Sequence, residues 1–344
     1  MAMIERARSV GGGDQGVALS DGACAFLVAT MARDLGIAAK LVSVPTSLPD
    51  FFAPVHPAEL TLDGRDFHKE LAAVASQVPD ADSYFVCLAK LHKSRLKYQR
   101  ILETQPIPTM DQVGPRGLLQ YGHVGPSALS GLLYWRKWFF DIDNRAGQET
   151  GYLFEPIIAL SIGGVPVSAS KSPVKRHTDK RKGRQVDCIK ASSAYEIKLR
   201  VTIAASGQGR WREEMDFPMD CRLSGFAPVL VVLDPTENAK LTELVAEFKA
   251  QKGKVFIGDA AWEHLETQAG PTMATFLERY VRRPLRDLIE STDDSLPPMS
   301  VSEKGTAITI RIGDETLRID RREAEPGGDE AELPEDVDEE AGGP

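Results

Sequence analysis

Hydrophobic residues recur at every third or fourth position through much of the first half of the chain, which predicts a mainly helical region. This spacing is found in residues 22–38, 65–77, 81–103 and 127–148. Asp82 is a suitable N-cap for the third of these helices. Residues 149–164 predict a further helical segment that ends at Gly163 and Gly164. Prolines and glycines predict loops over residues 44–64 and in the broken stretch that ends at Gly125.

After residue 164 the hydrophobic period changes to two, which is typical of strands. Residues 165–174, 184–192 and 194–204 predict three strands. Residues 209–225 suggest a broken helix. Then follow a buried apolar strand (227–235), a helix (236–251), a strand with a turn or helix (253–265), a helix interrupted at Pro284 (271–292) and a hairpin that turns at Gly313-Asp314 (306–321).

This order of elements predicts a mixed α/β core with a central sheet flanked by helices, a helical N-terminal region and a C-terminal hairpin. We expect a mainly helical region over 21–148, serving DNA binding or dimerisation, and an α/β core with the C-terminal helix and hairpin over 149–322. We expect residues 1–20 to be disordered. We expect the same of the acidic tail 323–344, because it is rich in Pro, Gly and acidic residues and cannot bury apolar surface.

The net charge of −9 comes from the tail alone. Ten of the 50 acidic residues lie in 323–344, with none of the 41 Lys and Arg, so the rest of the chain has 40 acids against 41 basic residues. The sequence shows no secretory signal, no apolar run long enough to span a membrane and no phosphate-binding loop for a nucleotide. Four widely spaced cysteines predict buried free thiols in a reduced cytoplasm.

Three charged residues in neighbouring predicted strands form the candidate chemistry. Glu196 and Lys198 are two positions apart and therefore project from one face of their strand, and Asp187 lies on the strand before it. Two close carboxylates repel unless a cation lies between them, and Mg²⁺ prefers such oxygen ligands. We expect Asp187, Glu196 and the carbonyl of Ile197 to bind Mg²⁺, and Lys198 to lie beside a metal-bound water. The alternative is a solvated strand face with a salt bridge.

Two further features adjoin this cluster. Glu155 lies in the preceding helical segment, and a helix packed on the sheet would bring it to the same site, as a partner behind the ligands or as a ligand of a second ion. The most basic segment of the chain runs directly into Asp187. We expect its cationic residues to contact DNA phosphates: Lys171, Lys175, Arg176, His177, Lys180, Arg181, Lys182 and Arg184.

These residues resemble the PD-(D/E)XK nuclease superfamily and, within it, the type II restriction endonucleases. The matching parts are Glu155, Asp187, the "EIK" of residues 196–198, the helix near 211 and the strand at 229–234, within residues 149–260 or about a third of the chain. Val186 stands where the motif has proline. The resemblance implies a nuclease-like mixed sheet and Mg²⁺-dependent cleavage of double-stranded DNA that leaves 5′-phosphate and 3′-hydroxyl ends.

The same resemblance implies a homodimer that acts on a short palindrome, because two-fold protein symmetry matches two-fold DNA symmetry. The polar segment 143–151 has the composition of a DNA-approaching segment, with Asn144, Arg145 and Gln148 as candidate contacts, and Arg210 could approach a phosphate at a helix start. Two other interpretations stay open: a repair or recombination nuclease with the same metal chemistry, and a DNA-binding protein without catalysis.

Overall fold

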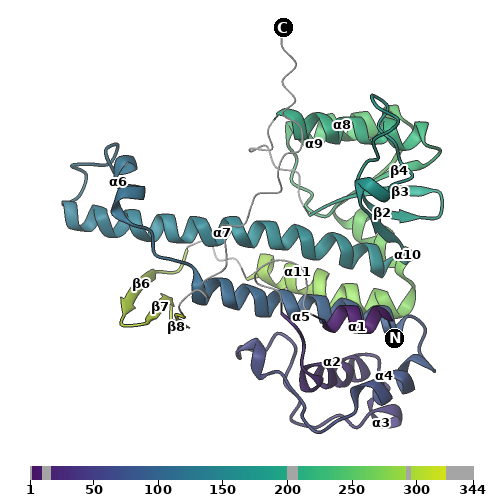
Figure 1. Cartoon of the computed structure of the whole chain (residues 1–344), viewed down its shortest axis with the longest axis horizontal. Coiled ribbons are helices and arrows are strands. Elements are labelled where there is room, and N and C mark those ends of the chain that lie inside the picture. Colours follow the sequence, from purple (N-terminus) through teal and green to yellow (C-terminus); the bar gives the residue numbers. More distant parts are fainter. Residues whose placement is uncertain (1, 10–16, 200–207, 292–295, 323–344) are drawn as a thin grey trace. The chain divides into compact units, whose positions relative to one another are not determined.

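The structure is a computed structural model, and it describes residues 2–9, 17–199, 208–291 and 296–322. The chain divides into two compact units (Figure 1). The first unit comprises residues 1–8, 20–92 and 148–292, and the second comprises residues 9–19, 93–147 and 293–344. None of the helices in the described ranges combines the length and apolar character that a membrane crossing requires.

A five-stranded mixed sheet forms the centre of the first unit, with its strands in chain order. β1 pairs antiparallel with β2 and β2 antiparallel with β3, whereas β3, β4 and β5 are parallel. The strands are β1 Val165–Val167, β2 Val186–Lys190, β3 Ser193–Lys198, β4 Ala227–Val232 and β5 Lys254–Ile257. The short turn between β2 and β3 explains their antiparallel pairing, and the two parallel connections each contain a helix, as parallel strands require.

Helices cover both faces of this sheet. The helices α8 (Gln208–Leu223) and α9 (Ala239–Ala250) bury Phe217 and Phe248 against Leu230 and Val232 of β4. On the other face, the ring of Tyr195 in β3 stacks on that of His264 in α10 (Asp259–Leu277). The predicted α/β class with a mixed central sheet flanked by helices is confirmed.

The first unit also contains helices away from this sheet. Helix α2 is buried on all sides over residues 22–32 and contacts α3 and α4. Ser20 caps α2 by accepting a hydrogen bond from the Ala23 N–H, and the buried Asp34 at its end accepts hydrogen bonds from the hydroxyls of Tyr84 and Tyr280. The elements are α1 Ala2–Arg8, α2 Asp21–Asp34, α3 Ala38–Leu41, η1 Pro57–Glu59, α4 Phe67–Ala75, the first part of α5 Ala81–Thr104, η2 Ala169–Lys171, η3 Glu278–Arg282 and α11 Arg283–Glu290.

The second unit has its own core. The helices α5, α6 (Met110–Gly117) and α7 (Pro126–Ser161) contribute to it, together with an antiparallel sheet of β6 Met299–Lys304, β7 Ala307–Ile312 and β8 Glu315–Asp320. Trp138 of α7 is fully buried with Ile308, Ile310 and Ile319, and its indole N–H donates to the Gln105 carbonyl at 3.3 Å.

Several boundaries differ from the sequence expectation. Helix α7 runs unbroken over residues 126–161 with Pro156 inside it, where two segments were expected. Pro156 removes one helix hydrogen bond, but the next residues, Ile157 and Ile158, are buried, and tertiary packing of this kind outweighs local propensity. Helix η3 likewise leads into α11 across Pro284, which stands in the first turn of α11, where proline is tolerated.

Local propensity also missed several elements. Helix α1 lies in the stretch expected to be disordered, and it buries Ile4 and Ala7. Helix α6 lies in an expected loop, where Thr109 and Gln112 form a capping box. The expected hairpin at Gly313 exists as β7 and β8, but β6 joins it, and this sheet belongs to the second unit. The second half of the expected strand 194–204 and the tail 323–344 lie largely or wholly outside the described residues.

The expected strand 165–174 also stops early, at Val167, and turns into η2. The basic segment then returns past η2, and Gly183 passes so close that an added Cβ would lie 2.0 Å from the backbone oxygen of Ala169. We expect Gly183→Ala to destabilise the protein by about 1–3 kcal/mol, the usual cost of overpacking, as measured by the melting temperature.

Gly147→Ala is the matched control, because nothing lies within 4 Å of its added Cβ in α7 and alanine favours a helix by roughly 0.5–1 kcal/mol. A Gly183→Ala protein that melts with the wild type would contradict the close approach.

Candidate active site

The pairing of β2 with β3 places two carboxylates opposite one another. The register pairs Cys188 with Tyr195 and Ile189 with Ala194, so its continuation by one pair sets Asp187 across from Glu196. Directly opposed residues of an antiparallel pair share a face of the sheet. The Ile197 N–H donates to Oδ2 of Asp187 at 2.8 Å, which holds the Asp187 carboxylate beside β3.

Lys198 lies next to this pair, on the face of the sheet that α8 covers. Its neighbours in β4 show which face this is, because Glu196 pairs with Leu230 and Lys198 with Val232, and both of these pack against α8 and α9. The Lys198 Nζ lies 2.7 Å from Oε1 of Glu196 and 3.3 Å from Oε1 of Glu214 on α8. All three side chains are at most 21% exposed.

Burial and like charge make this cluster electrostatically unfavourable on its own. Burial raises the pKa of Asp187 well above its ordinary value, and the carboxylates of Glu196 and Glu155 raise it further, against the smaller effects of the Ile197 N–H and Lys198. Burial alone would lower the pKa of Lys198, but Glu196 and Glu214 outweigh it, so the net pKa is raised and the ammonium stays charged. The carboxylates of Glu196, Glu214 and Asp187 therefore act on the Lys198 ammonium, and Glu155 acts on Asp187. Negative charge predominates among these groups, so a second positive charge would stabilise them.

The donor set suits a hard divalent ion. Asp187 and Glu196 supply two carboxylates, and the carbonyl of Ile197 lies in the strand between Glu196 and Lys198. Across the described ranges, no three or more His, Cys, Asp or Glu side chains are grouped so that they could hold a metal. Asp187 and Glu196 match the one or two carboxylates by which a hard ion such as Mg²⁺ is usually held, with several waters as its other ligands.

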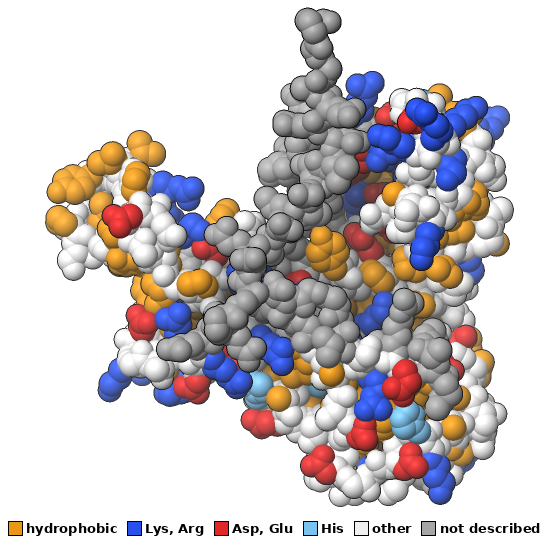
Figure 2. All heavy atoms as spheres, in the orientation of Figure 1, with side chains coloured by type: hydrophobic (Ala, Val, Ile, Leu, Met, Phe, Trp, Pro, Cys, Tyr) orange, Lys and Arg blue, Asp and Glu red, His pale blue; other side chains and the backbone are white. Residues whose placement is uncertain are grey.

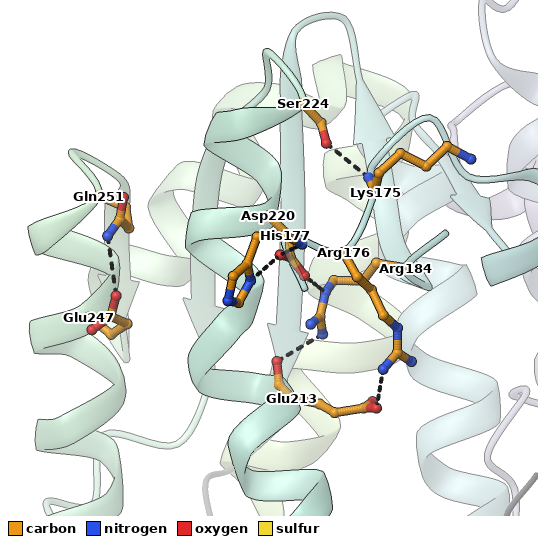
Figure 3. A network of polar contacts seen from close by, with 9 residues as sticks. All are labelled: Lys175, Arg176, His177, Arg184, Glu213, Asp220, Ser224, Glu247 and Gln251. Atoms are coloured by element: carbon orange, nitrogen blue, oxygen red, sulfur yellow. Dashed lines mark hydrogen bonds and ion pairs between the residues drawn. The ribbon is translucent and has the colours of Figure 1, made fainter. Parts of the chain in front are cut away.

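The basic segment is a folded loop attached to α8, as Figure 3 shows. Its two arms are joined by hydrogen bonds from the Arg176 N–H to the Lys182 carbonyl at 3.0 Å and from the Arg184 N–H to the Val174 carbonyl at 2.9 Å. The carboxylate of Asp220, fully buried on α8, accepts from the His177 N–H at 2.6 Å, from the His177 Nδ1 at 2.7 Å and from the Arg184 guanidinium.

Glu213 of α8 provides a second attachment for the loop. Its carbonyl accepts from Arg184 Nη1 at 2.8 Å, and its carboxylate pairs with Arg176 at 2.5 Å. Near the end of α8, the Ser224 hydroxyl accepts from the Lys175 N–H at 2.9 Å, while the Lys175 side chain extends away from the helix (Figure 3).

These contacts divide the residues that were expected to bind DNA. Arg184 is 7% exposed and holds the loop on α8, so the structure assigns it to the interior, and we remove it from the expected phosphate contacts. Arg176 and His177 are half-buried by their α8 partners, and Lys175 is half-buried as well. The exposed cations are Lys171, Lys180, Arg181 and Lys182, and Figure 2 shows Lys and Arg side chains gathered on this part of the first unit.

The other expected contacts lie elsewhere. Asn144 and Arg145 belong to the part of α7 in the second unit. Gln148 and Arg210 lie on α7 and α8, and their side chains are outside the described residues. Glu214 was missed by the sequence pattern. Its position could have indicated it. Glu214 lies early in the helix that follows the "EIK" strand, and that helix crosses over the sheet to reach the parallel strand β4, so its first turns pass near Lys198.

Comparison with known proteins identifies the family. A model of the ApaLI-like restriction endonuclease family matches residues 53–282, a range that contains every residue of the site and of the basic loop. The type II restriction enzyme ApaLI of Acetobacter pasteurianus is 48% identical over 292 residues, which cover 79% of this chain and 78% of the relative. The chain belongs to the ApaLI-like restriction endonuclease family. No solved structure matches it.

Membership in the ApaLI-like family makes the chain a restriction endonuclease, and so an enzyme that acts on double-stranded DNA. It agrees with the resemblance to type II restriction endonucleases that Asp187, Glu196 and Lys198 carry. Restriction endonucleases generally require a divalent metal ion.

We expect Asp187→Asn to stabilise the metal-free protein. The folded-state pKa of Asp187 is raised, so folding favours its protonated form, and the charged form lowers stability as the pH rises through that pKa. Asparagine removes the charge and can still accept the Ile197 N–H. At pH 7–8 in EDTA we expect a higher melting temperature, with about 1 kcal/mol corresponding to roughly 2–4 °C in a chain of this size.

Asp220→Asn is the matched control, because that buried carboxylate is paired with the Arg184 guanidinium and hydrogen-bonded to His177. It should lower the melting temperature, since it leaves the buried Arg184 without its charge partner. An Asp187→Asn protein that is no more stable than the wild type would contradict the clustering of charge described above.

Proposed function

We propose that this restriction endonuclease is a Mg²⁺-dependent enzyme of type II that hydrolyses phosphodiester bonds in both strands of a specific DNA sequence and leaves 5′-phosphate and 3′-hydroxyl ends. The observation that carries the proposal is the opposition of Asp187 and Glu196 across β2 and β3, with the Lys198 ammonium 2.7 Å from Glu196. The family match supports the reaction class.

Three groups would hold the ion. The carboxylates of Asp187 and Glu196 are its ligands in this proposal, and the Ile197 carbonyl is the third. Glu155, whose charge reaches Asp187 from α7, adds negative potential behind these ligands. When bound, Mg²⁺ supplies a nucleophilic water at neutral pH and stabilises charge on the phosphate.

Lys198 is the cation of the site that belongs to the protein. Its ammonium keeps its proton, because the pKa is raised by neighbouring carboxylates, so it acts as a hydrogen-bond donor. It orients the attacking water or neutralises negative charge that develops on the phosphate oxygens during attack. The Lys198 side chain is about one-fifth exposed, so it is not sealed from solvent.

The basic loop would place the DNA backbone at this site. Its exposed cations lie directly before β2 in the chain, and phosphate contacts of this kind give affinity and register without reading sequence. Arg176 and His177 remain proposed contacts at the edge of the loop, and Asn144, Arg145, Gln148 and Arg210 remain proposed contacts elsewhere. We further propose a homodimer that binds a short palindrome, since a two-fold axis in the protein matches one in the DNA.

Incubation of purified protein with plasmid DNA tests the reaction. We expect discrete fragments with Mg²⁺ and none with EDTA, and sequencing of the fragment ends should give one recurring site with 5′-phosphate termini. A smear would indicate a nuclease without sequence specificity, such as a repair enzyme. DNA that is shifted in a gel but intact would mean binding without catalysis, and either result would overturn the proposal.

Lys198→Ala tests the role of the ammonium. We expect the cleavage rate to fall by about 10²–10⁴-fold, the range in which single electrostatic or proton-transfer groups contribute, with DNA affinity unchanged. Lys254→Ala is the control, because this exposed lysine lies on β5 of the same sheet, away from the carboxylates. A Lys198→Ala enzyme that cuts at the wild-type rate would remove Lys198 from the mechanism.

A further inference from the structure

The Lys198 ammonium is shared by two carboxylates that come from different elements. Glu196 is two residues away on the same strand, and Glu214 reaches Lys198 from α8, with Oε1 at 3.3 Å from Nζ. The Glu214 side chain is 18% exposed, so it is held in a mostly buried position. Neither the metal ligands nor the basic loop requires a carboxylate there.

In the proposed function, Glu196 has two partners. It is a ligand of the ion, and it is also the closer carboxylate of Lys198. Oxygens that bind a divalent ion offer less negative charge to an ammonium, so metal binding weakens the pairing of Glu196 with Lys198. A lysine has a long flexible stem with about 2 kcal/mol of rotamer entropy, and it stays in one position only if a second group retains it.

Glu214 is well placed to be that group because α8 is firmly attached. Phe217 and Cys221, one and two turns further along, lie in the core of the sheet, and the carbonyl of Glu213 accepts a hydrogen bond from the buried Arg184. The Glu214 backbone is therefore held both by the packing of α8 on the sheet and by the contact with Arg184.

We propose that Glu214 is a positioning residue that keeps the Lys198 ammonium at the scissile phosphate once Glu196 is engaged with the metal ion. The inference rests on the proposed function. Glu214 touches neither DNA nor metal in this role, and its effect passes through Lys198. Loss of its charge should therefore slow the chemical step and leave DNA affinity unchanged.

The test compares Glu214→Gln with the wild type in single-turnover cleavage at saturating enzyme, with the dissociation constant for DNA measured separately in EDTA. We expect the rate to fall by about 10–100-fold, as is typical for residues that support a metal site from behind its ligands, with DNA affinity within about twofold. Glu214→Asp keeps the charge one methylene further back and should recover part of the rate.

Asp216→Asn is the matched control. It removes one negative charge from the same helix at a half-buried position, two residues along and so on a different side of α8. No ion pair involves Asp216 among the residues that the structure describes. We expect its cleavage rate and melting temperature to match the wild type.

A Glu214→Gln enzyme with the wild-type rate would overturn the inference, as would a parallel loss of rate and DNA affinity. If Glu214→Gln does not fold, Glu214→Ala takes its place, because it also removes the carboxylate, and a wild-type rate there would overturn the inference in the same way. The proposed function fails separately: an active Lys198→Ala enzyme contradicts the role of Lys198 itself, whereas an inactive Lys198→Ala enzyme beside a normal Glu214→Gln enzyme contradicts only the inference.

Discussion

Two carboxylates held against each other across neighbouring strands are the constraint on which the rest of the structure depends. Asp187 and Glu196 would separate in solution, but the antiparallel register of β2 and β3 and the bond from the Ile197 N–H fix them together. Burial raises the pKa of Asp187, and the Glu196 carboxylate opposite raises it further. Such repulsion in the free protein favours the binding of a cation, since a divalent ion between the two carboxylates attracts both of them.

Helix α8 contacts both the carboxylate site and the basic loop that is proposed to bind DNA. Its consecutive residues Glu213 and Glu214 have different partners. Glu213 pairs with Arg176 of the basic loop, as Figure 3 shows, whereas Glu214 pairs with Lys198. Asp220, two turns along the helix, gathers His177 and Arg184. One helix packed on the sheet therefore contacts both Lys198, the lysine proposed for catalysis, and the loop proposed to hold the DNA backbone.

Strands β2 and β3, and the grouping of Asp187, Glu196 and Lys198, could be predicted from the sequence because both follow from local rules. Alternation along residues 194–199 puts Glu196 and Lys198 on one face whatever surrounds them, and a short turn brings Asp187 back beside them. Contacts made by distant residues could not be predicted in this way. The pairing of Arg184 with Asp220 spans 36 residues. Within a run of basic residues, nothing in the local sequence distinguishes one that pairs with a buried carboxylate from one that would contact DNA. The continuity of α7 through Pro156 likewise depends on the burial of Ile157 and Ile158.

Anomalous scattering from crystals of the protein with Mn²⁺ in place of Mg²⁺ tests the central claim most directly, because it locates the ion without any assay of activity. The account expects a peak within about 2.0–2.3 Å of carboxylate oxygens from both Asp187 and Glu196, at the distances usual for a hard divalent ion. A well-ordered site without such a peak, or a peak bound only by other residues, would contradict it.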